Sequence, residues 1–441
     1  MKILTKGISF DDLKGFEQDL TQTPASDVIA RAVQQNGIDT TSKNHAAKKD
    51  LNRVFSVEVK TNSVTYQKQS GRCWLFSTLN TLRHDFEQKY KVKDFQFSQN
   101  YNSFYDRLEK ANKMLEWAIA LGNCPADDRQ YLAMLEWGDS DGGQWANGPA
   151  LINKYGVVPQ SVMPETYNSD ATKEISQVLN LKLRKEVTKL RQLMADGATE
   201  ENVRTHKKEA MSDVYKILVY AFGQPPKSFD FEYRDDDNNY HIDRDLTPQS
   251  FFQNYVAVDF DDYVVLADVP DHEYDKNYGM PSQDYVFEGK KIEIANVGLK
   301  AMKEAVIASL KDGQTVWFGC DVSQDMDRKD GILDTNYFKK SDLFSVDLAL
   351  SKADRLATRD GEVTHAMTMT GVDLIDDKPV KWKVENSWGD KFGDKGYFIM
   401  SDDWFDTYLY EVVINKKYVD DQSLKITKQP VENVAPWDSL R

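Results

Sequence analysis

The stretch GRCWLF (71–76) places Cys73 directly before an apolar pattern of helical spacing, with Gln67 six residues ahead of it. Apolar residues recur on one face as far as about Tyr90, so the sequence predicts a helix that begins at the cysteine. The positive end of a helix dipole favours a thiolate, and unpaired first-turn amides can donate to a substrate oxyanion. The side-chain amide of Gln67 can supply a second donor. Cys73 is therefore a candidate nucleophile, with a buried structural cysteine as the alternative.

Two residues far downstream provide the partners that a thiol nucleophile needs. His365 opens the alternating stretch HAMTMTGVDL (365–374), and Asn386 lies in VKWKVENSWGD (380–390). Both stretches have the composition and alternation of strands. A cysteine, a histidine base and an asparagine that orients the imidazole form the cysteine-peptidase version of the catalytic triad. Trp388 is expected to cover the His–Asn hydrogen bond, and it is also a candidate substrate-binding residue.

Taken together, these motifs resemble the papain superfamily, and more closely its bleomycin hydrolase and aminopeptidase C branch. The resemblance implies an α+β papain-like fold, with a helical half and an antiparallel β half. It also implies hydrolysis of peptide bonds and a homohexamer whose active sites face an inner chamber; the chemistry itself requires no cofactor. Further stretches similar to that branch are FSQNYNSFYDRLEKAN (97–112), GGQWANGPALINKYGVVP (142–159), VWFGCDV (316–322), GYFIMSDDWF (396–405) and APWD (435–438).

The glycine pair Gly142–Gly143 matches the position at which papain-like enzymes pair the substrate backbone with their own main chain. Glycine suits that position because the missing Cβ allows a close approach. Gly142 and Gly143 are therefore candidate substrate-binding residues, and an ordinary turn is the alternative.

The resemblance and the local patterns together predict five regions along the chain. Residues 166–290 are expected to form a helical insertion, which explains the long separation between Cys73 and His365. The predicted regions are an N-terminal oligomerisation arm (1–63), the helical half (64–165), the helical insertion (166–290), the β half with His365 and Asn386 (291–430) and a C-terminal arm near the cleft (431–441).

Composition is typical of an intracellular enzyme, and we expect a cytoplasmic location. Of the 441 residues, 40% are apolar, yet no apolar run is long enough to span a membrane. The first residues lack the apolar core of a secretory signal. The three cysteines, Cys73, Cys124 and Cys320, are too scattered for a disulfide framework, which favours a reducing compartment.

Charge and motif patterns argue against nucleic-acid and metal partners. The formal net charge is −15, and the most basic stretch, KLRKEVTKLR (182–191), has apolar residues at helical spacing, as in a solvated helix. The stretch DMDRKDG (325–331) resembles a calcium loop, but Lys329 occupies a position that needs an oxygen ligand. We therefore expect no nucleic-acid partner and no metal site.

The last residues, APWDSLR (435–441), bear on the type of peptidase. In the family that the chain resembles, aminopeptidase action comes from a C-terminus that lies in the cleft and holds the substrate α-amino group with its carboxylate. Relatives of that type usually extend further, and three fewer residues withdraw the carboxylate by roughly 10 Å. Arg441, a candidate substrate-binding residue, would also repel an incoming ammonium group. The expectation is an oligopeptide endopeptidase or mixed activity, with a strict aminopeptidase as the alternative and an inactive scaffold as a third hypothesis.

Overall fold

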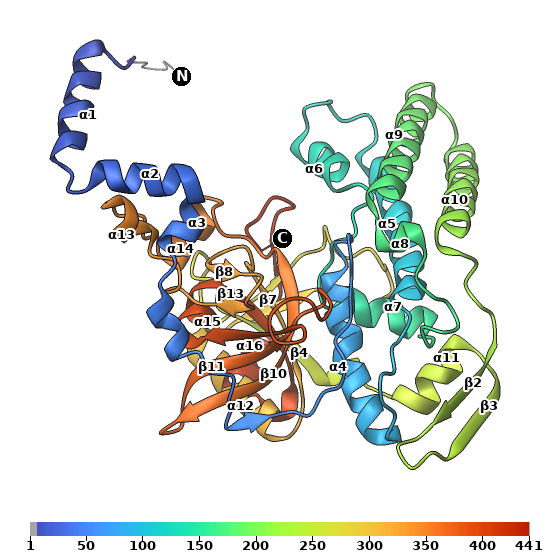
Figure 1. Ribbon diagram of the computed structural model, residues 1–441. Coiled ribbons are helices and arrows are strands. Elements are labelled where there is room, and N and C mark those ends of the chain that lie inside the picture. The colour runs from blue at the N-terminus through green and yellow to red at the C-terminus, as the bar shows by residue number, and fades with distance from the viewer. Residues whose placement is uncertain (1–6, 441) are drawn as a thin grey trace.

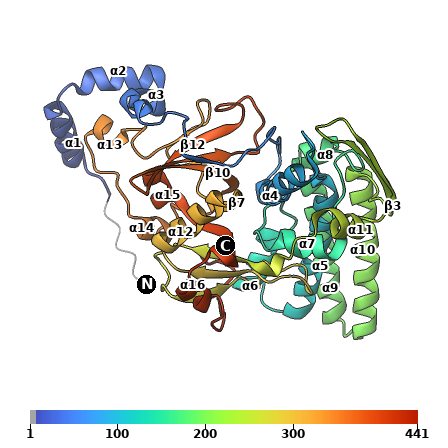
Figure 2. The same ribbon diagram turned by 90° about the horizontal axis from the view of Figure 1, so that it is seen from below.

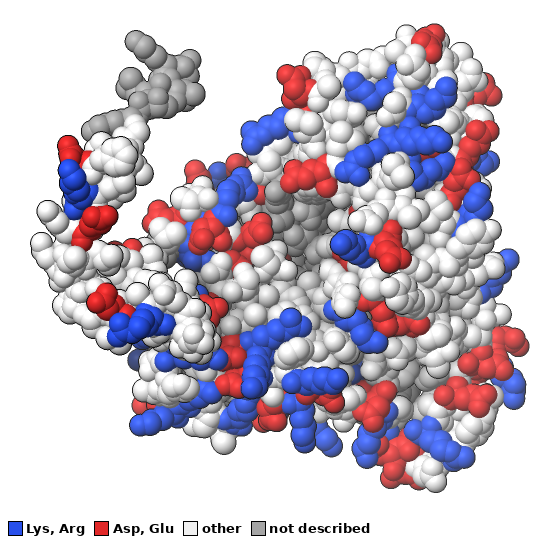
Figure 3. All heavy atoms as spheres, turned by 45° about the horizontal axis from the view of Figure 1, so that its top comes forward, with Lys and Arg blue, Asp and Glu red and all other residues white. Residues whose placement is uncertain are grey.

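The computed structural model describes residues 7–440, which form two halves (Figure 1), and one face of the molecule is hollowed (Figure 3). One half consists mainly of helices, and the other is built on a twelve-stranded sheet. Helix α4 (Cys73–Tyr90) lies where the halves meet and packs against strand β10 (His365–Ile375). The hydroxyl of Ser77, one turn into α4, donates to the Met367 carbonyl of that strand at 2.7 Å. The predicted nucleophile and the predicted base therefore lie on two elements that touch.

Long amphipathic helices build the helical half. Helices α9 and α10 pack on α5 through the apolar face that the sequence predicts, which includes Leu179, Leu183 and Val214. Helix α4 ends at Tyr90, the predicted end, because the left-handed backbone conformation of Lys91 stops it there. The helices of this half besides α4 are α5 (Gln99–Leu121), α6 (Arg129–Trp137), α7 (Asn147–Tyr155), α8 (Tyr167–Asp170), α9 (Lys173–Ala195), α10 (Glu200–Phe222) and α11 (Pro248–Phe251).

The main sheet has the strand order β14-β5-β6-β4-β13-β7-β10-β11-β12-β9-β8, and β1 pairs with β10 beside this path. Its central pairs, β13 with β7, β7 with β10 and β10 with β11, are all antiparallel. Apolar side chains cover both faces of the centre, one toward α4 and one toward α12. The strands are β1 (Val57–Glu58), β4 (Tyr263–Ala267), β5 (Lys276–Gly279), β6 (Glu293–Asn296), β7 (Val316–Cys320), β8 (Met326–Asp327), β9 (Ile332–Leu333), β10, β11 (Lys378–Glu385), β12 (Tyr397–Ser401), β13 (Leu409–Asn415) and β14 (Glu432–Asn433).

The region expected to be a helical insertion, 166–290, contains more than helices. A separate hairpin forms from β2 (Phe229–Arg234) and β3 (Tyr240–Leu246), and it lies below α11 in Figure 1. Strands β4 and β5, although they precede residue 291, belong to the main sheet. Their pairing with β13, β6 and β14 is set by contacts distant in sequence, which short apolar runs do not reveal.

The N-terminal segment projects away from both halves (Figures 1 and 2). It contains α1 (Phe10–Gln22), α2 (Ser26–Asn36) and α3 (Ile38–Ser42), and neither α1 nor α2 contains a buried residue. Residues just after α3 hold it to the β half, since the Asn44 amide donates to the Tyr337 carbonyl at 2.8 Å. The remaining helices are α12 (Leu299–Lys311), α13 (Lys340–Phe344), α14 (Lys352–Ala357), α15 (Asp402–Tyr408), α16 (Asp421–Ile426) and four single turns at His45–Lys49, Phe252–Val256, Phe260–Asp262 and Lys416–Tyr418.

Positive and negative side chains are interspersed over the face that carries the hollow (Figure 3). In the basic stretch 182–191, Lys182 pairs with Glu186 and Asp213, and Arg191 donates to backbone carbonyls. These contacts fit the solvated helix predicted there, while the absence of a nucleic-acid partner stays a prediction. Among residues 7–440, no helix combines the length and the apolar character needed to cross a membrane.

Candidate active site

Cys73 is the first residue of α4 and is partly exposed where the two halves meet. No side chain caps the helix, so its first amides are free to face the thiol. Burial of the sulfur raises the pKa of Cys73 to about 11, although hydrogen bonds from the amides of Ala366 and Trp74 act in the opposite direction. The Ala366 amide belongs to β10, one residue after His365. It therefore joins the nucleophile to the strand that carries the candidate base.

His365 is buried at the start of β10, and its Nε2 lies 2.9 Å from Oδ1 of Asn386. An Nε2–H that donates to this oxygen leaves Nδ1 as the nitrogen available to the thiol. Burial lowers the pKa of His365 to about 4, the bond to Asn386 opposes that change, and the nearby charge of Arg328 adds to it. The structure thus brings Cys73, His365 and Asn386 together, as the sequence predicts.

The helix terminus is expected to favour the thiolate of Cys73. Both pKa shifts act in the opposite direction. Burial stabilises the neutral thiol of Cys73 and the neutral imidazole of His365. An ion pair between them therefore depends on the mutual attraction of its two charges, which is strong where water is excluded. The helix terminus and the Ala366 amide then add to that attraction.

The indole of Trp388 covers the imidazole, with 4.9 Å between the ring centroids. The guanidinium of Arg328 lies 4.5 Å from the Trp388 ring and 4.3 Å from the Phe392 ring, so the indole is itself covered from outside. Trp388 thus shields the bond between His365 and Asn386, whose side chain is fully buried. The contact between the Trp388 and His365 rings fits this shielding role. The contact of Trp388 with substrate, which was also expected, stays a prediction.

Gln67 is held in a fixed orientation beside the Asn386 loop. Its amide nitrogen donates to the Ser387 carbonyl at 2.8 Å, and the Ser387 hydroxyl donates to its Oε1 at 2.6 Å. The side-chain Nε2 donates one hydrogen to the Ser70 carbonyl at 2.6 Å. Because Oε1 is occupied as an acceptor, the second Nε2 hydrogen is the group that can face a substrate oxyanion.

The loop that precedes Cys73 is fixed by buried charges. The Arg72 guanidinium donates to Glu165 at 2.9 Å and to the Ser169 carbonyl at 2.7 Å, both in the helical half. One residue earlier, the Gly71 amide donates to Oδ2 of Asp141 at 2.7 Å. Burial would raise the pKa of Asp141, but the charge of Arg107 and the hydrogen bonds from Thr172 and the Gly71 amide hold this pKa below its usual value. Asp141 therefore ties the loop at 138–144 to the residues just ahead of the nucleophile.

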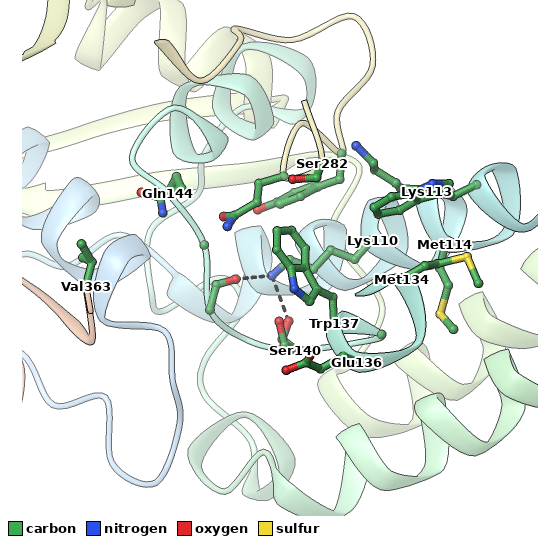
Figure 4. A pocket seen from close by; sticks show the side chains of 16 residues that line it. Lys110, Lys113, Met114, Met134, Glu136, Trp137, Ser140, Gln144, Ser282 and Val363 are labelled. Carbon is green, nitrogen blue, oxygen red and sulfur yellow. Dashed lines mark hydrogen bonds between the residues drawn. The ribbon is translucent and has the colours of Figure 1, made fainter. Parts of the chain in front are cut away.

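A cavity of about 390 Å³ lies beside the loop that packs on Trp74, the residue after the nucleophile, and both predicted glycines line it (Figure 4). A Cβ on Gly143 would lie 2.7 Å from the Trp74 indole, so only glycine lets this loop pack on α4. A Cβ on Gly142 would meet no atom within 4 Å, so the main chain there is open to a ligand. The remaining walls come from Lys110, Lys113, Met114, Trp117, Met134, Glu136, Trp137, Gly138, Ser140, Gln144, Ser282, Gln283, Tyr285 and Val363.

Lys110 binds the loop at 138–144 through hydrogen bonds (Figure 4). Its ammonium group donates to the carbonyls of Ser140 at 2.9 Å and Gly142 at 2.6 Å, and to Asp106 at 2.8 Å. The same carboxyl accepts a hydrogen bond from the Tyr285 hydroxyl at 2.5 Å. The cavity wall is therefore rigid on the side of the glycine pair. Among residues 7–440, no group of three or more His, Cys, Asp or Glu side chains is placed to hold a metal ion.

Comparison with known proteins identifies the family. The family model described as "Peptidase C1-like family" matches residues 7–441. The chain belongs to this family. This C1-like peptidase is 49% identical to Aminopeptidase E of Lactobacillus helveticus and 50% identical to Aminopeptidase G of Lactobacillus delbrueckii subsp. lactis. Each comparison covers 98% of the chain and 99% of the relative.

A solved structure of PepW from Lactobacillus rhamnosis HN001 superposes with a TM-score of 0.97. It is 47% identical and the comparison covers 98% of both chains. The papain-like α+β fold and the cysteine-type peptidase activity predicted from the sequence are thereby confirmed. The names of the relatives are those of aminopeptidases, and they do not support the endopeptidase or mixed activity expected from the C-terminal stretch.

The C-terminal stretch of this C1-like peptidase ends between the two halves (Figure 1). After β14 has paired with β5, His272 lies between Asp271 and Asp438, 3.0 Å from each carboxylate. Hydrogen bonds to Asp271 and then Asp438 raise the pKa of His272 to about 9, so the imidazole is protonated at neutral pH. Ser439 donates to Asp271 at 2.5 Å. Arg441 lies outside the described residues.

A second cavity, of about 400 Å³, separates this C-terminal stretch from α6. Trp437 closes one side of it, with its ring 3.8 Å from the Arg129 guanidinium and its carbonyl 2.5 Å from Arg359. Glu136 lines both this cavity and the one at Gly142. The C-terminal stretch of the C1-like peptidase therefore borders one end of the substrate region.

Several residues that shape the site were not predicted. The sequence indicated Asp141 only weakly, because this residue directly precedes the glycine pair. Ala366 contributes through its backbone, so its residue type gave no indication. Glu385, next to Asn386, accepts hydrogen bonds from Arg83 at 2.7 Å and from His84 at 2.9 Å. Glu385, Arg83 and His84 are all buried, and Arg83 and His84 lie on α4. The nucleophile helix and the asparagine strand are therefore joined by a buried ion cluster.

Proposed function

We propose that this chain is a cysteine aminopeptidase that removes residues from the N-termini of short peptides, with Cys73, His365 and Asn386 as its catalytic triad. One observation carries the proposal. Helix α4, which begins at Cys73, is held to the start of β10 by the bond from Ser77 to the Met367 carbonyl at 2.7 Å, and there the imidazole of His365 is oriented by Asn386 at 2.9 Å. A thiol, a base and an orienting amide in this arrangement are the requirements of thiol acyl transfer.

In the acylation step, Nδ1 of His365 accepts the Cys73 proton and the sulfur attacks the peptide carbonyl. The second Nε2 hydrogen of Gln67 and the Cys73 amide donate to the oxyanion that forms. The imidazolium then donates its proton to the leaving amine, the C–N bond breaks, and a thioester remains on Cys73. Asn386 accepts a hydrogen bond from Nε2–H throughout, which holds the imidazole in one tautomer.

In the deacylation step, the neutral imidazole of His365 accepts a proton from a water molecule that attacks the thioester. The same two donors bind the second oxyanion, and the carboxylic acid leaves as the thiol is restored. Trp388 lies against the imidazole and Arg328 lies over Trp388, so the base is shielded from water on that side.

Two features support the removal of N-terminal residues over internal cleavage. The C-terminal stretch borders the second cavity, which shares Glu136 with the cavity at Gly142, and it is anchored by the His272 clamp, so little of a peptide can extend past that end. The relatives of about half identity carry aminopeptidase names. Endopeptidase action and an inactive scaffold remain the outcomes that would contradict this part of the proposal.

Product analysis of one decapeptide, in free and N-acetylated forms, tests the function. We expect stepwise loss of N-terminal residues from the free peptide only, measured by mass spectrometry under reducing conditions. Internal fragments from both forms would establish an endopeptidase instead, and intact peptides would establish a scaffold. In Cys73→Ala, we expect turnover to fall below detection with an unchanged circular dichroism spectrum, since no other group can form the thioester.

The oligomer and location expected from the sequence also enter this proposal. On α1, Phe10 is 84% exposed, and Phe16 and Leu20 are exposed beside it, which supports a contact between α1 and another subunit. We propose a homohexamer in the cytoplasm. Light scattering on Phe10→Ser/Phe16→Ser should then show a smaller assembly than the unmodified chain, and an unchanged mass would count against an assembly role for α1.

A further inference from the structure

The side chain of Asp141 lies against the loop that carries the nucleophile. Its Oδ2 accepts hydrogen bonds from the Gly71 amide at 2.7 Å and from the Thr172 hydroxyl at 2.5 Å. Its main-chain carbonyl accepts a hydrogen bond from the Trp74 indole at 2.9 Å. Gly71 precedes Cys73 by two residues and Trp74 follows it directly, so Asp141 is bound on both sides of the nucleophile.

One oxygen of the Asp141 carboxylate has no hydrogen bond. Both bonds to the side chain reach Oδ2, and within residues 7–440 none reaches Oδ1. A Cβ built on Gly71 would lie 2.8 Å from this Oδ1, so the glycine leaves the space beside it open. The side chain is 20% exposed, which gives a ligand access to the free oxygen. Although burial acts against it, the charge of Arg107 and the two hydrogen bonds hold the pKa of Asp141 below its usual value, so the carboxylate is ionised at neutral pH.

The buried charges behind Asp141 leave it without a full counter-ion. Of the two cations on α5, Lys110 donates to Asp106 at 2.8 Å. The other, Arg107, donates to Asp139 and reaches Oδ2 of Asp141 only at 3.9 Å, which is too long for a hydrogen bond. Asp106, Asp139 and Asp141 therefore share two cations, and one negative charge is in surplus. A partly buried carboxylate in this state gains more from a cationic ligand than one in water does.

Asp141 and Gly71 line a cavity of about 630 Å³ that extends to α9, called the α9 cavity below. Asp139 lines it too, and its Oδ1 has no hydrogen-bond partner within residues 7–440 although the residue is only 2% exposed. Ser140 lines both the α9 cavity and the cavity at Gly142–Gly143 (Figure 4). A space of this size accommodates a long side chain of a ligand.

Two cations, Lys173 and Arg184, line the same cavity from α9. Both are exposed, and Arg184 donates to the Leu135 carbonyl at 2.9 Å. Water screens exposed charges more strongly than partly buried ones. A positively charged ligand group is therefore more stable beside Asp141 and Asp139 than on the α9 side of the cavity.

The substrate residue whose carbonyl carbon Cys73 attacks must lie close to this carboxylate. In the thioester, the Cα of that residue is bonded to the carbonyl carbon that the sulfur carries. Burial raises the pKa of the Cys73 thiol most, and the charge of Asp141 adds to this rise, so the carboxylate is within electrostatic reach of the sulfur. The side chain of the attacked residue therefore starts near Asp141 and the opening of the α9 cavity.

We propose that Asp141 is a specificity-determining residue whose carboxylate binds the cationic side chain of a lysine or arginine at the residue whose carbonyl carbon Cys73 attacks. The inference rests on the proposed peptidase function and names its substrate class; for an aminopeptidase, the basic residue is the N-terminal one. The ammonium or guanidinium group supplies the hydrogen bond that Oδ1 lacks and the positive charge that the buried cluster lacks. The bound cation also offsets the repulsion between Asp141 and the thiolate, so it should raise kcat as well as lower KM.

Kinetics on four tetrapeptides that differ only in the first residue test this role. Lysine is compared with norleucine, and arginine with citrulline, so that each pair changes the charge and little else. We expect the unmodified chain to prefer the charged member of each pair by about 10- to 100-fold in kcat/KM. Asp141→Asn keeps an oxygen for the Gly71 amide and should bring both ratios to within about threefold of unity. An unmodified chain without this preference, or a preference that Asp141→Asn leaves unchanged, would overturn the proposal.

Three variants separate the charge of Asp141 from its structural role. Thr172→Val removes a hydrogen bond to the carboxylate but no charge, so both preferences should remain. Glu174→Gln removes a negative charge from an exposed position of α9 and should change neither preference by more than about twofold. Gln177→Lys adds a cation at an exposed position that lines the α9 cavity, and it should lower both preferences by about two- to fivefold. If Asp141→Asn does not fold, an unchanged preference in Gln177→Lys rejects the proposal and a lowered one supports it.

Binding measurements keep this test independent of turnover. Calorimetry on Cys73→Ala and on Cys73→Ala/Asp141→Asn compares the affinities of the lysine and norleucine peptides. In the double variant, the lysine peptide alone should lose about 10- to 100-fold in affinity. This loss, in a chain whose unmodified form cleaves nothing, would support the binding site and reject the peptidase. Cleavage with a ratio of lysine to norleucine that Asp141→Asn does not change would support the peptidase and reject the binding site.

Discussion

Two buried glutamates on the central sheet, Glu385 and Glu411, have opposite environments. Glu385 accepts hydrogen bonds from Arg83 and His84, whereas Oε1 of Glu411 has no partner within residues 7–440. Burial would raise the pKa of Glu385, but the charges of His84 and Arg83 outweigh it and hold the pKa below its usual value. Burial raises the pKa of Glu411 to about 7 without opposition.

The difference separates an acid that joins two parts of the fold from one that burial leaves uncompensated. The partners of Glu385 come from α4, so the cluster joins the nucleophile helix to the strand next to Asn386. Glu411 faces the small residues Gly319, Ala267 and Ala366, which offer its carboxyl group no hydrogen bond from a side chain.

The largest effect that would test this contrast is expected for Glu385→Gln. The substitution leaves the buried Arg83 guanidinium without its anion, which should lower the free energy of unfolding by about 3 to 5 kcal/mol. Urea denaturation at pH 7 measures this. As a control, Arg83→Met/Glu385→Leu removes both charges and should cost clearly less than the single change. A single change that costs under about 1 kcal/mol would mean that the cluster is not a stabilising pair.

A smaller effect of opposite sign is expected for Glu411→Gln. Because the folded pKa of about 7 lies above the usual 4.5, the folded protein binds a proton more tightly than the unfolded chain does. Below about pH 4.5, Glu411 therefore does not lower the free energy of unfolding. This free energy falls as the pH rises from about 4.5 to about 7. Glu411→Gln avoids this loss and should be more stable by about 3 kcal/mol at pH 8 and equally stable at pH 4. Equal stability at both pH values would show that the carboxyl group is solvated or paired.

Glu385 should show the reverse dependence. Its folded pKa is below the usual value, so its contribution is present above about pH 4.5 and is lost as the pH falls through the folded pKa. The difference in stability between the unmodified chain and Glu385→Gln should shrink on acidification, while that for Glu411→Gln grows with increasing pH. Parallel denaturation series from pH 4 to pH 8 measure both, and similar slopes would remove the contrast.

The smallest effect is expected for His84→Gln. Glutamine can still donate to Glu385, and Arg83 keeps its bond, so one hydrogen bond to Thr315 and part of a charge interaction are lost. We expect a decrease of about 1 to 2 kcal/mol. Thermal unfolding is sensitive enough for this change. A decrease as large as that of Glu385→Gln would assign the pairing to His84 rather than to Arg83.

Local patterns were sufficient for the triad. The apolar spacing after Cys73 predicts α4 to its last residue, Tyr90, and the alternation after His365 predicts β10. Both depend only on neighbours along the chain, which a single sequence displays. The family motifs then place Gln67 and Asn386, and the structure brings both to the same loop.

The environments of Glu385 and Glu411 could not be predicted from local patterns. The alternation in LYEVVIN (409–415) does not say which face meets the nucleophile, and a bulge between Leu409 and Glu411 shifts the register. Pairing of β13 with β7 joins residues about ninety positions apart, and no local signal encodes that distance. For the same reason β4 and β5 were assigned to a helical insertion although they belong to the sheet.

The hydrogen bond from the Ser77 hydroxyl of α4 to the Met367 carbonyl of β10 crosses the boundary between the two halves of the molecule. Neither half holds a complete catalytic set, since α4 carries the thiol and the sheet carries the imidazole and its amide partner. The turnover rate therefore depends on the contact between the two halves as well as on the chemical steps. A solvent, temperature or mutation that lets them separate slightly would silence the enzyme while every helix and strand is still formed.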